Sequence, residues 1–158
     1  GESMLRERAF DAVGSLQRWL ELRFDDNQTA ANLFSILQPE EYVDGQVICH
    51  QGEDADGIYF LDRGRVDVVS HDMPGQAFRI YSYMRHTMLG EMGFVRRETR
   101  SADLIARGTT VIYTLSRETY EKLEKARDPS VDALLHLISV TLSDRIISAT
   151  RTIGELQS

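Results

Sequence analysis

The chain has 158 residues, of which 42% are hydrophobic, and this length suits one domain with helical extensions. The net charge of −7 argues against a nucleic acid partner, because such binding relies on Lys and Arg to neutralise phosphates. No run is long enough for a membrane span and no signal peptide is recognisable. The single cysteine, Cys49, excludes an internal disulfide, fits a reducing cytoplasm and is expected to be a small buried strand residue.

Residues 4–40 are predicted to form an N-terminal helical segment. Apolar residues recur at three- and four-residue steps and predict an amphipathic helix over 4–24: Leu5, Ala9, Val13, Leu16, Leu20 and Phe24. A second, short helix is predicted over 30–37, where Pro39 stops it. Residues 1–3 precede Met4 and are interpreted as a cloning remnant, so they take no part in the fold.

Between 41 and 116 the pattern changes to short apolar and β-branched runs separated by Gly, Asp and Pro. The predicted strands are 47–49, 58–61, 65–70, 78–83, 102–106 and 111–115. Residues 71–76 have the composition of a hairpin loop. Many short strands with regular turns predict a mainly β fold with flanking helices (α+β), built as an antiparallel jelly-roll barrel.

Residues 117–158 are predicted to form two helices. Ser116 is placed as the N-cap of the first, and Pro129 lies in the first turn of the second, where proline is tolerated. No Gly or Pro interrupts the second helix until Gly154. Its apolar stripe fits a helix packed against the barrel, a lid or dimer helix that reports ligand occupancy, or both: Val131, Leu134, Leu135, Ile138, Leu142, Ile146, Ala149, Ile153 and Leu156.

The stretch 90–102 has the composition of a small anion site. Gly90 and Gly93 let the backbone approach a ligand without an intervening side chain. A predicted short helical turn begins here, and its free N–H groups around Met92 and Gly93 favour an anion.

Three further side chains in this stretch add the groups that a sugar phosphate needs. Arg100 supplies a planar, permanently charged fork for phosphate oxygens, and Ser101 adds a hydroxyl. Glu91 only accepts hydrogen bonds when ionised, so it suits sugar hydroxyls rather than phosphate.

The run that opens Gly-Glu-Met-Gly-Phe and closes Arg-Ser-Ala resembles the phosphate-binding cassette of cyclic-nucleotide-binding domains. Residues 45–68 are similar to the front half of that family, with Gly-x-x-Ile, a Gly-Glu turn, Tyr-x-Leu and Gly-x-Val-x-Val. The resemblance covers about residues 42–116. It implies a phosphate between Arg100 and the short helix, a ribose on Glu91, and a C-terminal helix closing over the base. The implied ligand-binding set is Gly90, Glu91, Met92, Gly93, Arg100, Ser101 and Ala102, with Val68 and Ile80 against the base.

Three residues depart from the family pattern. Thr99 stands where proline is usual, Asp103 where threonine is usual, and His86 where a turn glycine is frequent. An inward Asp103 would repel the phosphate, whereas strand alternation favours an outward Asp103, on the face opposite to Ala102 and Leu104.

The resemblance implies a regulatory domain, not an enzyme, that binds cAMP or cGMP and needs no cofactor or metal. Short matches such as 115–118 and 142–146 resemble domains that follow a STAS domain at the C-terminus of bacterial SulP-type anion transporters. That placement implies a cytoplasmic domain, tethered to the inner membrane through a larger protein without inserting into it. A homodimer through the terminal helices is a further expectation, and the choice of nucleotide stays open.

Other interpretations of the same residues remain. The cassette is otherwise a tight turn in which Arg100 pairs with Glu98, or part of a barrel with a nonfunctional pocket that acts in assembly through its terminal helices. The four histidines lie on separate segments without a His-x-His pattern, which disfavours a cupin-type metal enzyme. The acidic residues Glu53, Asp54 and Asp56 lie between two glycines and predict a solvated turn, with no nucleophile beside it.

Overall fold

The computed structural model describes residues 16–157, so most of the helix predicted over 4–24 lies outside the described residues; its last part, 16–21, is helical. The next helix, α2, spans Asn27–Ser35. It begins three residues before the predicted 30–37, because the side chain of Asp26 accepts the N–H of Gln28 at 2.8 Å and caps the helix there.

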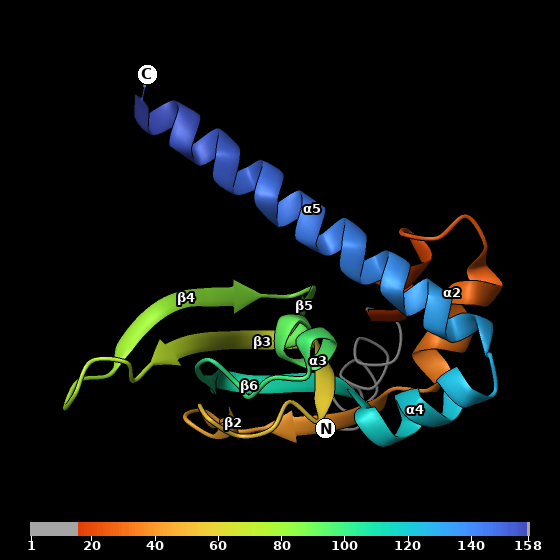
Figure 1. Cartoon of the computed structure of the whole chain (residues 1–158), viewed down its shortest axis with the longest axis horizontal. Helices are drawn as coiled ribbons and strands as arrows, with labels where there is room; N and C mark the ends of the chain where they lie inside the picture. The colour runs from red at the N-terminus through yellow and green to blue at the C-terminus, as the bar shows by residue number, and fades with distance from the viewer. Residues whose placement is uncertain (1–15, 158) are drawn as a thin grey trace, which may run out of the picture.

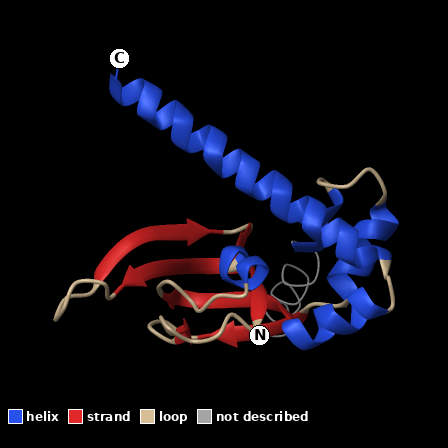
Figure 2. Ribbon diagram, viewed as in Figure 1, coloured by secondary structure: helices blue, strands red, loops and turns tan. Residues whose placement is uncertain are grey.

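The described strands form one antiparallel sheet with helices at one end (Figures 1 and 2). The strand order is β1-β6-β3-β4, while β2 pairs with β6 and β5 pairs with β3. The prediction of a mainly antiparallel β fold with flanking helices is therefore confirmed. The strands are β1 (Gln38–Tyr42), β2 (Val47–Cys49), β3 (Gly57–Ser70), β4 (Phe78–Met84), β5 (Thr87–Leu89) and β6 (Asp103–Ser116).

Two of these strands are longer than predicted. β3 joins the predicted strands 58–61 and 65–70, and β6 joins 102–106 and 111–115. At both junctions a glycine takes a left-handed conformation, with φ of 88° at Gly64 and 68° at Gly108. The register of β3 against β6 shifts beside Arg63, so β3 bends through the glycine instead of ending there.

The sheet also begins earlier than the predicted boundary at residue 41. β1 starts at Gln38 and contains Pro39, which was expected only to stop the preceding helix. β1 lies at the edge of the sheet, where a strand tolerates proline because one side of its backbone needs no hydrogen-bond partner. β5 was not predicted either, because three residues are too few to show a period-2 pattern.

Two helices follow the sheet. α4 spans Arg117–Lys125, and the predicted cap is confirmed, since the Ser116 side chain accepts the N–H of Thr119 at 3.1 Å. α5 spans Pro129–Gln157, begins where predicted and continues through Gly154.

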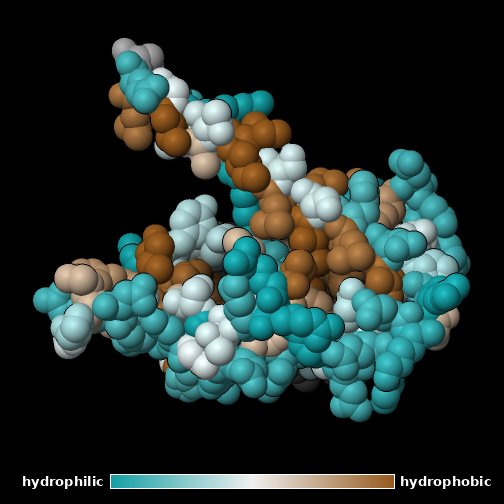
Figure 3. Space-filling model, viewed as in Figure 1, coloured by the Kyte–Doolittle hydropathy of each residue, from teal (hydrophilic) through white to brown (hydrophobic). Residues whose placement is uncertain are grey.

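The two halves of α5 have different surroundings. The first half packs on α2 and the end of the sheet, with Val131, Leu134, Leu137 and Ile138 buried. The second half extends over the sheet toward the C-terminus and carries apolar surface on its exposed side chains (Figures 1 and 3). No helix within residues 16–157 is both long and apolar enough to cross a bilayer.

Buried side chains form two clusters that frame the region between the sheet and α5. One lies under the helices and includes Leu20, Leu33, Phe60, Met88, Phe94 and Leu134. The other lies within the sheet and includes Leu61, Val66, Leu89, Leu104 and Ile112. The neighbouring residues Met88 and Leu89 of β5 belong to different clusters, which places the loop after β5 at the boundary between them.

Candidate functional site

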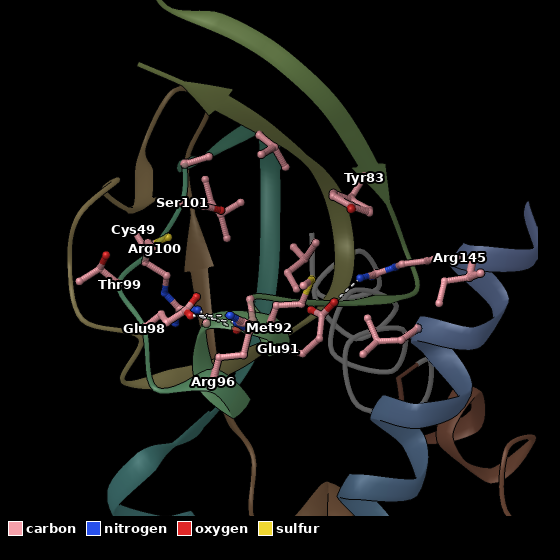
Figure 4. A pocket seen from close by; sticks show the side chains of 18 of the residues that line it. Cys49, Tyr83, Glu91, Met92, Arg96, Glu98, Thr99, Arg100, Ser101 and Arg145 are labelled. Atoms are coloured by element: carbon pink, nitrogen blue, oxygen red, sulfur yellow. Dashed lines mark hydrogen bonds and ion pairs between the residues drawn. The ribbon is translucent and has the colours of Figure 1, made fainter. Parts of the chain in front are cut away.

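A cavity of about 660 Å³ opens where the loop after β5 meets the sheet and α5. Figure 4 shows Arg100, Ser101 and Cys49 on one side of it and Tyr83 and Arg145 on the other. Eight of the nine predicted ligand-binding residues line this cavity: Val68, Gly90, Glu91, Met92, Gly93, Arg100, Ser101 and Ala102. The sheet contributes mainly apolar side chains, and the charged groups come from the cassette and from α5.

The short helix α3 (Glu91–Arg96) forms one wall of the cavity. Gly90 is its N-cap in a left-handed conformation, with φ of 75°, and a Cβ there would collide with the guanidinium of Arg100. A Cβ at Gly93 would lie 3.1 Å from the Cβ of Ala55. Gly90 is therefore required by its backbone conformation and by close packing, whereas a side chain at Gly93 would only make a tight contact. The first N–H groups of α3 have no intrahelical acceptor.

Arg100 is almost completely buried, with 6% of its surface exposed. Its Nη1 donates to the carbonyl of Gly90 at 2.9 Å and its Nη2 to that of Gly57 at 2.6 Å, while the guanidinium lies 4.8 Å from the ring centre of Tyr59. Its Nε is buried and has no hydrogen-bond acceptor among residues 16–157. A buried unpaired donor costs roughly 1–3 kcal/mol, so the cavity presents a fixed cation with one N–H group, at Nε, that still lacks an acceptor.

Glu91, the first residue of α3, is 3% exposed and pairs with Arg145 of α5 (Figure 4). Nη1 of Arg145 donates to Oε1 of Glu91, and Nη2 donates to the hydroxyl of Thr87 at 3.1 Å and to the carbonyl of Met88. The guanidinium also lies 5.2 Å from the ring centre of Tyr83. One side chain therefore ties α5 to β4, β5 and α3 at the edge of the cavity.

The cavity wall contributed by the sheet and α5 is mainly apolar. It is formed by Val68, Leu89 and Leu104 from the sheet and by Leu142, Ile146 and Ala149 from α5. Burial raises the pKa of the Tyr83 hydroxyl above its usual value. Burial likewise raises the pKa of the Cys49 thiol, which keeps it protonated and confirms it as a buried strand residue. These groups therefore offer a ligand an uncharged contact surface.

Ile80 does not line the cavity, contrary to the prediction. It is 62% exposed on β4. The register places Tyr81 opposite Val68 and Arg79 opposite Val69, so Ile80 is the extra residue of a bulge and the alternation along β4 is interrupted there. Tyr83, beyond the bulge, faces the cavity in its place.

Asp103 faces away from the cavity, as strand alternation predicted, while Ala102 and Leu104 line it. It is nevertheless not a solvated residue. Its Oδ1 accepts the N–H of Gln51 at 2.7 Å, and its Oδ2 lies 2.6 Å from Nε2 of His71. Burial alone would raise the pKa of Asp103, but these two contacts lower it. Asp103, which departs from the family pattern, therefore holds the loop after β3 in place and does not repel an anion in the cavity.

The alternative interpretation of Arg100 as a surface charge is wrong. Glu98 pairs with Arg96 at 2.9 Å, whereas Arg100 is buried. The acidic residues of 53–56 are exposed in a turn, as predicted. Within residues 16–157 no group of His, Cys, Asp and Glu side chains is arranged to hold a metal ion.

Arg145 is the main residue that sequence reasoning missed. It lies within the 142–146 match, which implies no role for it. The sequence contains a signal for Arg145: it is the only arginine or lysine between Arg127 and Arg151, and it lies on the apolar stripe between Leu142 and Ala149. A charged residue on an otherwise apolar helix face indicates a specific partner.

Comparisons with known proteins agree with this geometry. A family model described as the cyclic nucleotide-binding domain matches residues 39–127. The chain is 28% identical over 105 residues to the cAMP-dependent protein kinase regulatory subunit of Dictyostelium discoideum, covering 65% of this chain and 32% of that protein. It is 28% identical over 117 residues to the cAMP-activated global transcriptional regulator CRP of Pasteurella multocida, covering 73% of this chain and 54% of that protein.

A solved structure shows the same fold. It is a cyclic nucleotide-binding domain from Methylobacillus flagellatus, with a TM-score of 0.75 and 21% identity over 94% of this chain and 84% of that one. This likeness confirms the predicted jelly-roll fold. The chain spans about a third of the kinase subunit and about half of the CRP protein, so it corresponds to one part of each.

Proposed function

This chain belongs to the cyclic nucleotide-binding domain family, and we propose that its cavity binds cAMP or cGMP in a regulatory role. The observation that carries the proposal is Arg100, a buried cation whose Nε lacks an acceptor at one end of a cavity of about 660 Å³. An anionic phosphate placed there supplies the missing acceptor. The hydroxyl of Ser101 and the first N–H groups of α3 line the same end and add donors.

The other parts of the nucleotide have matching walls. A ribose beside the phosphate has Glu91 as its hydrogen-bond acceptor, because a carboxylate accepts from hydroxyls. The base then lies against the apolar surface of Val68 and Leu104 and under α5. Tyr83 adds an aromatic ring at this end of the cavity. These contacts do not distinguish adenine from guanine.

The pair between Glu91 and Arg145 supplies a route by which occupancy reaches α5. Ribose hydroxyls and Arg145 both use the carboxylate of Glu91, so ligand binding weakens the contacts that tie α5 to the cassette. Two positions of α5 then differ in their affinity for nucleotide, and the ligand shifts the population between them.

The central test is calorimetric titration of the chain with cAMP and cGMP, with 5′-AMP as a non-cyclic control. Arg100→Ala should abolish measurable binding, since removal of one partner of a buried charged contact typically costs ~2–5 kcal/mol. Arg100→Lys keeps the charge but loses the planar fork, so it should also bind more weakly. Arg79→Ala, on the exposed part of β4, is the matched control. Equal affinities for wild type and a folded Arg100→Ala variant would refute the site.

The larger protein is a separate part of the proposal. The relatives named above are longer than this chain, which supports a domain that reports to other domains. We place it after a STAS domain in the cytoplasmic part of a SulP-type anion transporter, on the short sequence matches alone. An antibody against this domain should then detect, in the source cells, a membrane-bound band well above 18.0 kDa. A band confined to the soluble fraction would exclude the transporter.

A second candidate function is an assembly module with a nonfunctional pocket. It is favoured by the far half of α5, where Ile146, Ile153 and Leu156 are 66%, 56% and 82% exposed. Under this alternative the chain forms a homodimer through α5 and binds no nucleotide. Light scattering after size exclusion, with and without cAMP, distinguishes the two: a ligand-independent dimer with no calorimetric signal supports the module.

A further inference from the structure

A second hollow, of about 530 Å³, is lined by arginines and shares no lining residue with the first cavity. These arginines are four in number, and the fold gathers them from β3, β6 and the residue that follows β4. The lining residues are Asp44, Arg63, Gly64, Arg65, Met84, Arg85, Arg107, Gly108 and Thr109.

The backbone around this hollow is tightly constructed. A Cβ on Gly64 would lie 2.5 Å from the carbonyl oxygen of Thr109 and 2.8 Å from the Cα of Thr110, so only glycine fits there. The hydroxyl of Thr110 is fully buried and lies 3.1 Å from the carbonyl of Gly108 and 3.4 Å from that of Arg65. Both strands that carry the arginines are therefore held in place at this point.

Two of the arginines stand directly opposite each other, since Arg65 of β3 pairs in register with Arg107 of β6. Like charges in this position destabilise a sheet. The buried carboxylate of Asp67 offsets part of the repulsion: it accepts from Nε of Arg107 at 2.9 Å and lies 3.4 Å from Nε of Arg65. Burial alone would raise the pKa of Asp67, but hydrogen bonds from Ser82 and Arg107 lower it, so it stays ionised.

Asp67 engages both guanidiniums only through Nε. Their terminal Nη groups donate no hydrogen bond to any of residues 16–157. Arg85 adds a third guanidinium and forms no ion pair with a described residue. The one carboxylate in the lining, Asp44, already accepts the N–H of Gly108 at 2.7 Å.

Arg65, Arg85 and Arg107 therefore bring to the hollow terminal guanidinium donors that no described residue accepts, and from these donors we infer that the hollow binds a phosphate-type oxyanion with at least two negative charges. Guanidinium forks match the geometry of phosphate oxygens bidentately, and all four cations here are arginine rather than lysine. The ligand is free inorganic phosphate or pyrophosphate, or the phosphate group of a small phosphomonoester. This site is separate from the proposed nucleotide site: Tyr83 lines the first cavity and Met84 the second, and successive strand residues point to opposite faces.

The test is a calorimetric titration with inorganic pyrophosphate and, as a second arm, with glycerol 1-phosphate, at constant ionic strength in chloride buffer. The two arms distinguish an inorganic anion from an organic phosphate. The main variant is Arg85→Gln, because Arg85 pairs with no described residue and its loss should leave the fold intact. Arg107→Gln is the second variant, and Arg79→Gln, exposed on the same strand as Met84, is the matched control.

We expect at least one probe to bind wild type and Arg79→Gln with equal affinity. The same probe should bind Arg85→Gln and Arg107→Gln at least tenfold more weakly. Arg85→Gln should leave the melting temperature and any cAMP affinity unchanged. The inference would be overturned if neither pyrophosphate nor glycerol 1-phosphate bound at millimolar concentration. It would also be overturned by equal affinities in wild type and Arg85→Gln, or by binding that disappears in Arg100→Ala, which would place the anion in the first cavity.

Discussion

Replacing Arg145 with alanine tests the contact between α5 and the cassette most directly. The substitution leaves Glu91, 3% exposed, without its cation and removes the donors to Thr87 and Met88. Breaking a fully buried pair in this way costs about 3–5 kcal/mol. The Arg145 side chain is 31% exposed, so screening by solvent reduces the loss to about 2 kcal/mol. For a domain of this size that corresponds to a fall of roughly 4–8 °C in melting temperature.

The same substitution should strengthen nucleotide binding. Without Arg145, ribose hydroxyls no longer compete for the carboxylate of Glu91, and we expect cAMP affinity to rise about tenfold, or ~1.4 kcal/mol. Urea unfolding and calorimetry measure the two effects on the same preparation. Arg151→Ala, on the exposed end of the same helix, should change neither.

Arg145→Ala is expected to lower the stability of the domain and to raise its affinity for cAMP, and this combination makes the prediction easy to refute. If Arg145→Ala binds cAMP more weakly than wild type while remaining folded, Arg145 contacts the ligand instead of competing with it. A double-mutant cycle with Glu91→Gln measures the pair itself, and residues in direct contact usually couple by about 0.5–3 kcal/mol. A coupling near zero would show that the pair does not hold α5 in solution.

Three further predictions concern the cassette and its neighbours. Glu91→Gln should weaken nucleotide binding less than Arg100→Ala, because Glu91 meets hydroxyls and Arg100 meets a full charge; the reverse order in calorimetry would exchange the two roles. Gly90→Ala should destabilise the domain and weaken binding, since its left-handed backbone and the adjacent guanidinium leave no room for a Cβ, and unchanged melting and affinity would contradict this. Asp103→Asn should leave nucleotide affinity unchanged at every salt concentration, because the side chain faces away from the cavity. The native-state pKa of Asp103 is lowered, so its contribution to stability is present above the ordinary pKa of about 4 and is lost as the pH falls through the native value. The excess stability of wild type over Asp103→Asn should therefore shrink in acid. A stability difference that does not depend on pH would refute the role given to His71.

Features of the molecule that depend on near neighbours in the chain were predictable. Ser116 caps α4 and α5 begins at Pro129 because a cap and a first-turn proline act within a few residues. Most of the site was predictable for the same reason, since seven of the eight predicted residues that line the cavity lie within 90–102, and the turn and short helix bring them together. The predicted strand over 47–49 has the bounds of β2.

Features that depend on how distant segments cross were decided only by the tertiary structure. The family resemblance implied Ile80 against the base, but the register sets Tyr81 opposite Val68 and leaves Ile80 as the extra residue of a bulge, outside the cavity. Arg145 reaches Glu91 across 54 positions of the chain, and the arginines of the second hollow meet because two strands bend at Gly64 and Gly108. Periodicity identifies the apolar face of a helix or strand, but the angle at which elements cross determines which charged side chain lies opposite which, and that angle is set by packing over the whole domain.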